Sequence, residues 1–179
     1  MIGVPIEDLR DLLICDAEGG ALTWRERPRE MFATDKSFTV WNKRFAGKRA
    51  LNASNGKGYL RGMVNWRKMF AHRVIWAMHY GAWPVGEIDH INGDKADNRI
   101  VNLRDVSHGE NTRNAAIRRD NRTGAVGVFK VGERYAAYIR SGKRRVDLGR
   151  HASFDEALSA RRVAERKLGF HENHGRRTA

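Results

Sequence analysis

The stretch from Glu87 to Asn111, EIDHINGDKADNRIVNLRDVSHGEN, decides how the rest of the chain is interpreted. It holds an adjacent carboxylate and imidazole, Asp89 and His90, and two later amides, Asn102 and Asn111. A hard cation such as Mg²⁺ is served by one or two protein oxygen ligands together with substrate phosphate oxygens. An imidazole beside such an ion, oriented by a second group, can take a proton from an attacking water. The stretch therefore has the residue types that phosphodiester hydrolysis needs.

The local pattern predicts where these residues lie. Residues 87–91 alternate polar and apolar side chains as a strand does, and Asn92-Gly93-Asp94 is typical of a turn. A loop then leads to a second short apolar segment at residues 100–106. Ser107-His108-Gly109-Glu110 has the form of a capping box, which predicts a helix with Asn111 in its first turn. Strand, loop, strand and helix should bring Asp89 and Asn111 close together.

With this core and the preceding Ala71-His72-Arg73-Val74-Ile75-Trp76, the chain resembles the HNH endonucleases of the phage and intron homing type. The resemblance implies a ββα-metal fold in which Asp89 and Asn111 bind one divalent ion, Mg²⁺ or alternatively Mn²⁺. It also implies that His90 is the general base and that Asn102 orients its imidazole. The last motif residue is asparagine instead of histidine, a variant that the homing type commonly uses.

Composition limits the protein class. The 179 residues, 41% hydrophobic and 31% charged, suit one ordinary soluble domain or two small ones. No apolar run approaches the ~18 residues of a membrane helix, and the early charges after residue 6 argue against a signal peptide. With Cys15 as the single cysteine, a disulfide within the chain and a cysteine-rich structural zinc site are excluded. We expect a cytoplasmic protein, acting by the resemblance in a bacterial host.

The charge distribution favours a nucleic-acid partner. The chain has 34 Lys and Arg against 21 Asp and Glu, a net charge of +13. Up to Asn111 there are 17 basic and 14 acidic residues, and after it 17 basic and 7 acidic. Such a basic segment is typical of polyanion binding. The basic residues are interleaved with turns and short strands and do not form one amphipathic helix, so double-stranded DNA is the expected partner and a membrane is not.

The first 86 residues are expected to pack around the nuclease core. Residues 5–13 predict a short helix after Pro5, and residues 21–24 a short strand. Residues 25–37 are polar and predict an irregular segment, either a solvated connector or a DNA-contacting loop. Strands at residues 59–64 and 68–71 precede a helix at 74–80 that ends at Gly81. His72 fits a packed structural histidine better than a ligand or phosphate contact.

After Asn111 the helix should continue to residue 119, where Arg113 and Arg118 are candidate phosphate contacts. Residues 120–124 predict a linker. Three strands are expected at residues 125–130, 135–140 and 144–149, with an apolar and a basic face. Ser153-Phe154-Asp155-Glu156 predicts a helix that runs to Leu168 and packs on the apolar face.

This segment resembles the Apetala-type, ethylene-response-factor-like DNA-binding domain in Gly127-Val128, in Tyr135-Ala136-Ala137-Tyr138-Ile139-Arg140, in Arg145-Val146-Asp147-Leu148-Gly149 and in the Ala-rich helix. Such sheets can enter the major groove. By the resemblance, Arg140 and Arg145 match DNA-reading positions, whereas Val126, Phe129 and Asp147 depart from the family pattern. The predicted DNA-binding residues of this module are Lys130, Arg134, Tyr138, Arg140, Lys143 and Arg145.

The sequence therefore predicts an α+β protein. Residues 1–86 would wrap the core, 87–120 form the HNH motif, 121–170 form a three-stranded antiparallel sheet with a helix, and 171–179 form a tail. The expected activity is metal-dependent hydrolysis of DNA phosphodiester bonds by a homing endonuclease. The alternatives are a DNA-binding regulator with an inactive core and a restriction-type or packaging-associated HNH nuclease. Double-strand cutting by one such site requires dimerisation or sequential nicking.

Overall fold

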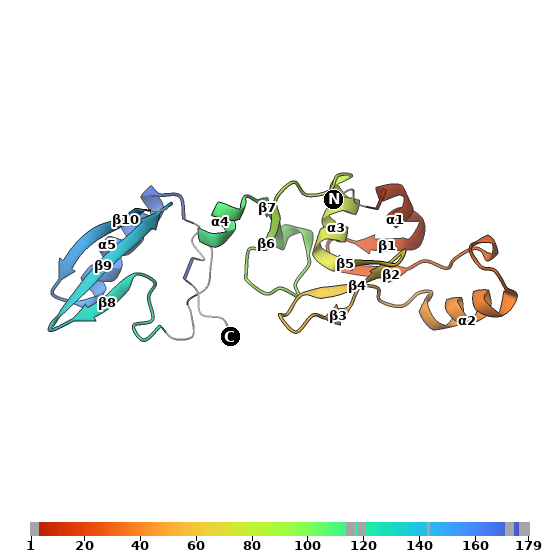
Figure 1. Cartoon of the computed structure of the whole chain (residues 1–179), viewed down its shortest axis with the longest axis horizontal. Helices are drawn as coiled ribbons and strands as arrows, with labels where there is room; N and C mark the ends of the chain where they lie inside the picture. Colours follow the sequence, from red (N-terminus) through yellow and green to blue (C-terminus); the bar gives the residue numbers. More distant parts are fainter. Residues whose placement is uncertain (1–3, 114–116, 118–120, 143, 171–173, 176–179) are drawn as a thin grey trace. The chain divides into compact units, whose positions relative to one another are not determined.

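The computed structural model of the chain describes residues 4–113, 117, 121–142, 144–170 and 174–175 (Figure 1). The chain divides into two compact units, Met1–Val106 and Ser107–Ala179. Both combine helices with small antiparallel sheets, and each has its own buried apolar cluster. No helix within the described ranges has the length and apolar character needed to cross a bilayer.

The core of the first unit forms where two helices cover a hairpin. Helices α1 (Ile6–Leu12) and α3 (Ala71–Tyr80) contact each other and the hairpin of β1 (Leu13–Asp16) and β2 (Ala21–Trp24). The apolar residues of α1 and α3 recur at helical spacing, so one stripe of each helix is buried. The fully buried side chains here include Leu9, Leu13, Val74 and Ile75.

The predicted C-terminal end of helix α3 is confirmed. Gly81 follows the helix with a φ of 70° and donates its backbone N–H to the Ala77 carbonyl at 2.9 Å. Glycine takes this left-handed conformation without a steric cost, which is why it commonly ends helices. The helix starts at Ala71, three residues before the predicted start, directly after a strand.

A second small sheet of order β3-β4-β5 leads into α3. It consists of β3 (Ala53–Ser54), β4 (Leu60–Val64) and β5 (Arg67–Phe70), and the two strands predicted on either side of an Asn65-Trp66 turn are confirmed. Val64 is fully buried against the core, whereas its neighbour Met63 is exposed, as alternation along a strand requires.

The expectation of an irregular segment over residues 25–37 is wrong in part. A 3₁₀ turn, η1 (Arg29–Met31), is followed by helix α2 (Asp35–Phe45), which begins inside that segment. Thr34 caps α2 by accepting a hydrogen bond from the Ser37 N–H at 3.1 Å. The aromatic residues of α2 recur at helical spacing, and the stripe they form packs on η1 and on Trp24. The stripe consists of Phe38, Trp41 and Phe45.

Strand β6 (Glu87–His90) pairs antiparallel with β7 (Leu103–Val106), as the sequence predicts. The second predicted segment, residues 100–106, is strand only in its latter half. Its first three residues form a 3₁₀ turn, η2 (Ile100–Asn102). Ile100 is buried and donates its N–H to the Ala17 carbonyl at 2.8 Å, which ties this loop to the hairpin of β1 and β2.

The second unit has the predicted three strands and helix. Its sheet has the order β10-β9-β8, with β8 (Val128–Val131), β9 (Arg134–Ser141) and β10 (Arg144–His151). Helix α5 (Phe154–Lys167) contacts all three strands. Ala125, Val128, Ala137 and Ala157 are buried between the sheet and the helix. Val146, expected on the buried face, is partly exposed at the edge strand β10.

The first predicted capping box is present in full, and the second only in part. Ser107 precedes α4 (His108–Arg113); its N–H donates to the Glu110 carboxylate at 2.9 Å, and its hydroxyl accepts from the Glu110 N–H at 3.3 Å. Ser153 precedes α5 and accepts from the Glu156 N–H at 3.2 Å, but the Glu156 carboxylate accepts from the Ala152 N–H instead of that of Ser153. The expected continuation of α4 beyond residue 113 lies largely outside the described residues.

Candidate active site

The hairpin of β6 and β7 positions the two central residues of the candidate site. Along β6, Ile88 and His90 point into the unit and Asp89 points outward, as alternation dictates. Asp89 is the cross-strand partner of Arg104. The guanidinium donates two hydrogen bonds to one carboxylate oxygen, Oδ2, at 2.9 Å from Nε and 2.6 Å from Nη2. The predicted metal ligand is therefore held by an arginine that the sequence analysis does not single out.

His90 is more deeply buried than we expect of a general base that faces the substrate phosphate. Only 3% of the residue is exposed. Its ring packs against those of Tyr59 and His72, with centroid distances of 5.9 and 5.1 Å. Burial lowers the pKa of the imidazole, and the hydrogen bond that the ring donates to the Asn98 amide oxygen and the charge of Asp89 oppose that shift in part. At neutral pH the ring is therefore uncharged, which is the form a general base needs.

The amide that contacts the His90 imidazole is Asn98, not Asn102. His90 Nε2 lies 3.0 Å from Asn98 Oδ1. An amide oxygen only accepts, so this contact assigns the ring proton to Nε2 and leaves the lone pair on Nδ1. Asn98 is 1% exposed, and its Nδ2 makes no hydrogen bond within the described part of the chain.

Asn102, which the resemblance makes the orienting residue, holds the loop instead. Its Oδ1 accepts from the Asn92 N–H at 2.9 Å, and its Nδ2 donates to the Asp97 carbonyl at 2.7 Å. Its carbonyl also accepts from the Ile91 N–H. These bonds join the two ends of the loop between β6 and β7. Asn102 therefore acts on His90 indirectly, by fixing the loop that carries Asn98.

The same loop is stabilised by an ion pair and by a close glycine. Asp97 bonds Arg99 through both carboxylate oxygens, and this arginine lowers the pKa of the Asp97 carboxyl to about 2. Gly20 faces the loop from the hairpin of β1 and β2, with a φ of +68°. A Cβ at Gly20 would lie 2.5 Å from the Arg99 nitrogen and 2.7 Å from the Asn98 carbonyl carbon. Only glycine allows this approach.

His72 is buried, in agreement with the packed role expected for it. Its ring stacks on Phe70 at 5.4 Å with an interplanar angle of 17°. Burial, with His90 and Arg73 nearby, lowers the pKa of His72 to about 3, so the ring is neutral. Arg73 donates to the carbonyls of Gly86 and Pro84 and thereby fixes the chain that enters β6.

The donor chemistry around Asp89 fits a hard divalent ion bound through few protein ligands. Among the described residues, no three His, Cys, Asp or Glu side chains are grouped to hold a metal. An ion at Asp89 would thus depend on this carboxylate, an amide oxygen and substrate phosphate oxygens, which is how Mg²⁺ is often held. Asn111, the other predicted ligand, lies in α4 of the second unit, where its N–H donates to the Ser107 carbonyl at 3.0 Å.

The predicted DNA-binding residues of the sheet lie mainly on the face away from α5. In β9, Arg134, Tyr138 and Arg140 share that face, and Arg145 joins them because it pairs with Arg140. Lys130 differs, since it pairs with Tyr135 and so lies on the side that faces α5. Lys143 and Arg118 lie outside the described residues, and Arg113 is described only through the backbone of α4.

Aromatic rings hold part of this arginine face in place. The Arg145 guanidinium carbon lies 4.1 Å from the Tyr138 ring centroid and 5.8 Å from that of Phe129. Such stacking holds a cation near aromatic faces and leaves its edge available to other groups. Beneath the sheet, the buried Arg161 of α5 donates to the Tyr138 carbonyl and to Glu165.

Sequence reasoning misses three residues that build the two sites: Asn98, Arg104 and Arg161. Strand register offers a signal for Arg104, because the pairing of β6 with β7 puts a basic residue opposite Asp89. The i,i+4 spacing of Arg161 and Glu165 on α5 is a second usable signal. For Asn98 the sequence offers none, since its contact depends on the path of a long loop.

Residues 69–113 match the family model described as HNH endonuclease. The match covers 45 of the 179 residues and runs from β5 to α4, so it includes Asp89, His90, Asn102 and Asn111. A search of curated proteins found no match, and a search of solved structures found none. The chain therefore contains an HNH endonuclease domain at residues 69–113, which supports a nuclease that acts on DNA.

Proposed function

We propose that the chain is a divalent-metal-dependent endonuclease that hydrolyses phosphodiester bonds of double-stranded DNA. The observation that carries the proposal is the pair Asp89 and His90 on one strand, with the His90 Nε2 proton held by Asn98. This arrangement lies inside the segment that matches the HNH endonuclease family. An uncharged imidazole with a fixed tautomer is prepared to accept a proton at one defined atom.

In the proposed reaction, His90 Nδ1 takes the proton of a water that attacks phosphorus. Asn98 keeps Nε2 protonated throughout, so the ring receives the proton at Nδ1 and becomes an imidazolium that the Asp89 charge stabilises. The P–O3′ bond breaks and the leaving 3′ oxygen takes a proton from solvent, which by the family resemblance leaves 5′-phosphate and 3′-hydroxyl ends.

Asp89 and Asn111 are the proposed protein ligands of the ion, Mg²⁺ or Mn²⁺. When bound, the ion supplies positive charge that stabilises the leaving 3′ oxygen. Arg104 keeps the Asp89 carboxylate in a fixed direction through its two hydrogen bonds and adds a positive charge beside it. Both effects favour a phosphate group at this position.

The sheet of the second unit is the proposed DNA-positioning module, as its resemblance to the Apetala-type domain implies. Support comes from Arg134, Arg140 and Arg145 on the face away from α5. Arg145→Ala should weaken DNA binding several-fold and reduce the salt slope by about 1, because one phosphate contact releases about one counterion. Arg162→Ala, an exposed change on α5, is the matched control and should leave both quantities unchanged. Equal binding by the two variants would reject the module.

We also propose that the protein is of the phage or intron homing type and acts in a bacterial cytoplasm. The division into a nuclease motif at 87–120 and a DNA-binding module at 121–170 is part of the same proposal. A DNA-binding regulator that does not cut is the second candidate. Two observations favour it: His90 is buried, and one Asp89 oxygen is engaged by Arg104.

Cleavage of supercoiled plasmid in Mg²⁺ and in EDTA separates the two candidates. The nuclease proposal expects nicked or linear product in Mg²⁺ and none in EDTA, with Asp89→Ala inactive in both. Intact plasmid in Mg²⁺ and in Mn²⁺, with DNA nevertheless bound, favours the regulator.

A further inference from the structure

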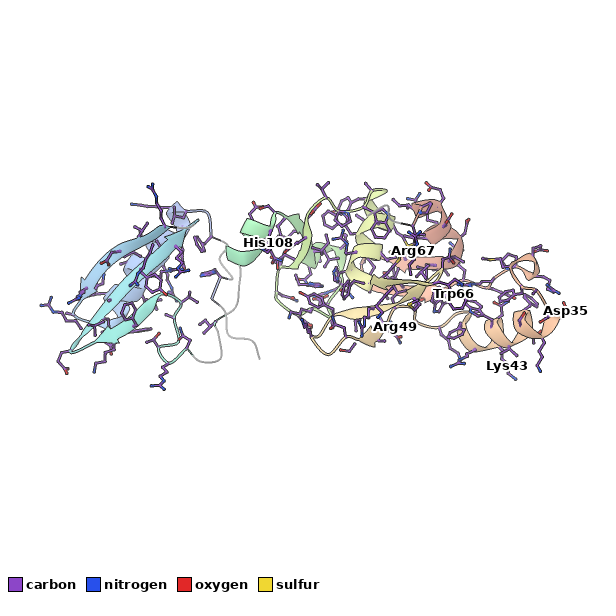
Figure 2. All side chains as sticks on the ribbon, in the orientation of Figure 1. Asp35, Lys43, Arg49, Trp66, Arg67 and His108 are labelled. Carbon is purple, nitrogen blue, oxygen red and sulfur yellow. The ribbon has the colours of Figure 1, made fainter. Side chains whose placement is uncertain are left out.

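The hairpin of β4 and β5 ends in a tryptophan that the fold does not use. Trp66, labelled in Figure 2, is 94% exposed. It occupies the turn together with Asn65, and both residues have positive φ, 61° and 46°. Two-residue turns of this kind favour glycine at the second position, and a bulky side chain there is strained. Folding alone therefore gives no reason for tryptophan at this position.

One face of the hairpin behind Trp66 is open and carries basic groups. Register places Arg61 opposite Phe70 and Met63 opposite Lys68, so these four side chains share a face. They lie on the side away from Val64, which is buried in the core. Met63 is 49% exposed and Lys68 is exposed as well. The hairpin thus presents two cations and two apolar side chains on one surface.

Ring contacts join this surface to the buried His90 of the candidate active site. Phe70, at the end of β5, stacks on His72, and the His72 ring contacts that of His90 at a centroid distance of 5.1 Å. Tyr59, which precedes β4, contacts both Phe70 and His90, at 5.7 and 5.9 Å. All these residues belong to the first unit. A ligand that reaches His90 would therefore lie beside the hairpin.

Charge along the chain identifies the class of ligand. Residues 36–86, which include α2 after its first residue Asp35, the sheet of β3 to β5 and α3, contain ten Lys and Arg and no Asp or Glu. The net charge of residues 1–111 is nonetheless small, because the acidic residues cluster before and after this segment. A segment with basic and no acidic side chains, which places Arg61 and Lys68 beside exposed aromatic and apolar groups, complements the phosphates and bases of a nucleic acid.

We propose that the hairpin of β4 and β5 is a DNA-binding element of the nuclease unit. Trp66 stacks on a base step of the duplex, and Arg61 and Lys68 contact phosphates between that step and the scissile bond. The identity of the polyanion rests on the proposed function. Aromatic and apolar side chains that enter a groove unstack base steps in this way.

The strand also limits the place of the contact. Trp66 lies four positions before Phe70, which corresponds to roughly 14 Å, or about four base pairs at 3.4 Å per step. His90 lies beyond Phe70, across the His72 ring. Distortion of the duplex is therefore expected several base pairs from the cleaved bond.

Binding is measured in EDTA, so that cleavage plays no part, on a labelled duplex of mixed sequence. Trp66→Ala should bind about tenfold more weakly, because one base stacking contact is lost. Trp66→Phe should retain most of the affinity. The control Val85→Ala changes another fully exposed apolar residue of the same unit and should leave affinity unchanged. Permanganate reactivity of thymines should mark the unstacked step with the wild type and not with Trp66→Ala.

A folding measurement excludes a structural role. Trp66→Gly removes the side chain and relieves the positive φ, so its melting temperature should equal or exceed that of the wild type while its DNA affinity falls as in Trp66→Ala. Wild-type affinity and thymine reactivity in Trp66→Ala would overturn the proposal. So would a Trp66-dependent affinity for vesicles of anionic phospholipid, or a Trp66-dependent self-association in sedimentation, without an effect on DNA.

The two proposals fail separately. If the wild type does not cut plasmid in Mg²⁺ but Trp66→Ala binds DNA more weakly, the hairpin inference stands and the nuclease proposal falls. If the wild type cuts and Trp66→Ala binds and distorts DNA as the wild type does, only the hairpin inference falls.

Discussion

Replacing Asn98 tests whether the amide that contacts His90 sets its reactivity. Asn98→Ala removes the 3.0 Å contact between Asn98 Oδ1 and His90 Nε2. The buried Nε2–H then lacks an acceptor, which costs about 1–3 kcal/mol. If the active tautomer of the uncharged ring, with its proton on Nε2, is destabilised by that energy, kcat falls by about 5- to 150-fold at 1.36 kcal/mol per factor of ten. DNA affinity should not change, because Asn98 is buried.

The pH profile gives the sharper readout. Asn98 raises the pKa of His90 against the larger lowering by burial. Removal of the amide therefore lowers the pKa further, and the acid limb of the rate profile moves to lower pH. Asn98→Asp supplies a carboxylate acceptor and moves the limb to higher pH.

Asn102→Ala is the matched control, since its side chain bonds only the loop backbone. It should lower stability and rate without moving the acid limb. Single-turnover cleavage across pH, with DNA affinity measured in parallel, provides the test. A wild-type rate and profile for Asn98→Ala, or a shifted limb for Asn102→Ala, would refute the assignment of the orienting role to Asn98.

Three further changes test the packing around the two sites. Gly20→Ala should lower the melting temperature and the cleavage rate, because its Cβ would collide with the backbone of the loop that carries Asn98. The control Gly47→Ala has a similar φ and open space around its Cβ, and it should keep the wild-type rate. Since burial lowers the pKa of His72 to about 3, the unfolded state binds the proton first, and stability should be lost as pH falls from about 6.5 towards 3, at up to about 1.4 kcal/mol per unit. His72→Phe should flatten this dependence in denaturant titrations, and an unchanged slope would contradict the buried neutral ring. Arg161→Met should destabilise the second unit by about 3 kcal/mol, as expected when a buried ion pair loses one partner. The control Arg162→Met changes an exposed residue and should have little effect. Equal melting curves for the two variants would count against the Arg161 contacts.

Local signals predict much of the fold. Alternation and the Asn-Gly turn predict β6, the two capping boxes predict the starts of α4 and α5, and Gly81 predicts the end of α3. These features depend on neighbours within a few residues, which the sequence displays directly. The three-stranded sheet of the second unit follows for the same reason, because short hairpin turns fix its register.

The misses have two different causes. Helix α2 carries a local signal, because Phe38, Trp41 and Phe45 recur at helical spacing after the Thr34 cap, but the polar composition of residues 25–37 favours an irregular segment. Asn98 and Asn102 are both asparagines of one loop, and only the folded path of that loop determines which one contacts His90. The family resemblance selects Asn102, and the structure separates the role of holding the loop from that of contacting the imidazole.

The proposed function depends on proton transfer by His90 in a DNA-cutting site. Single-turnover plasmid cleavage in Mg²⁺ by the wild type and by His90→Ala tests this role, with DNA affinity determined for both proteins in EDTA. We expect cut DNA with 5′-phosphate ends for the wild type, and intact DNA with unchanged affinity for His90→Ala. Cleavage by His90→Ala at the wild-type rate would show that His90 does not transfer the proton.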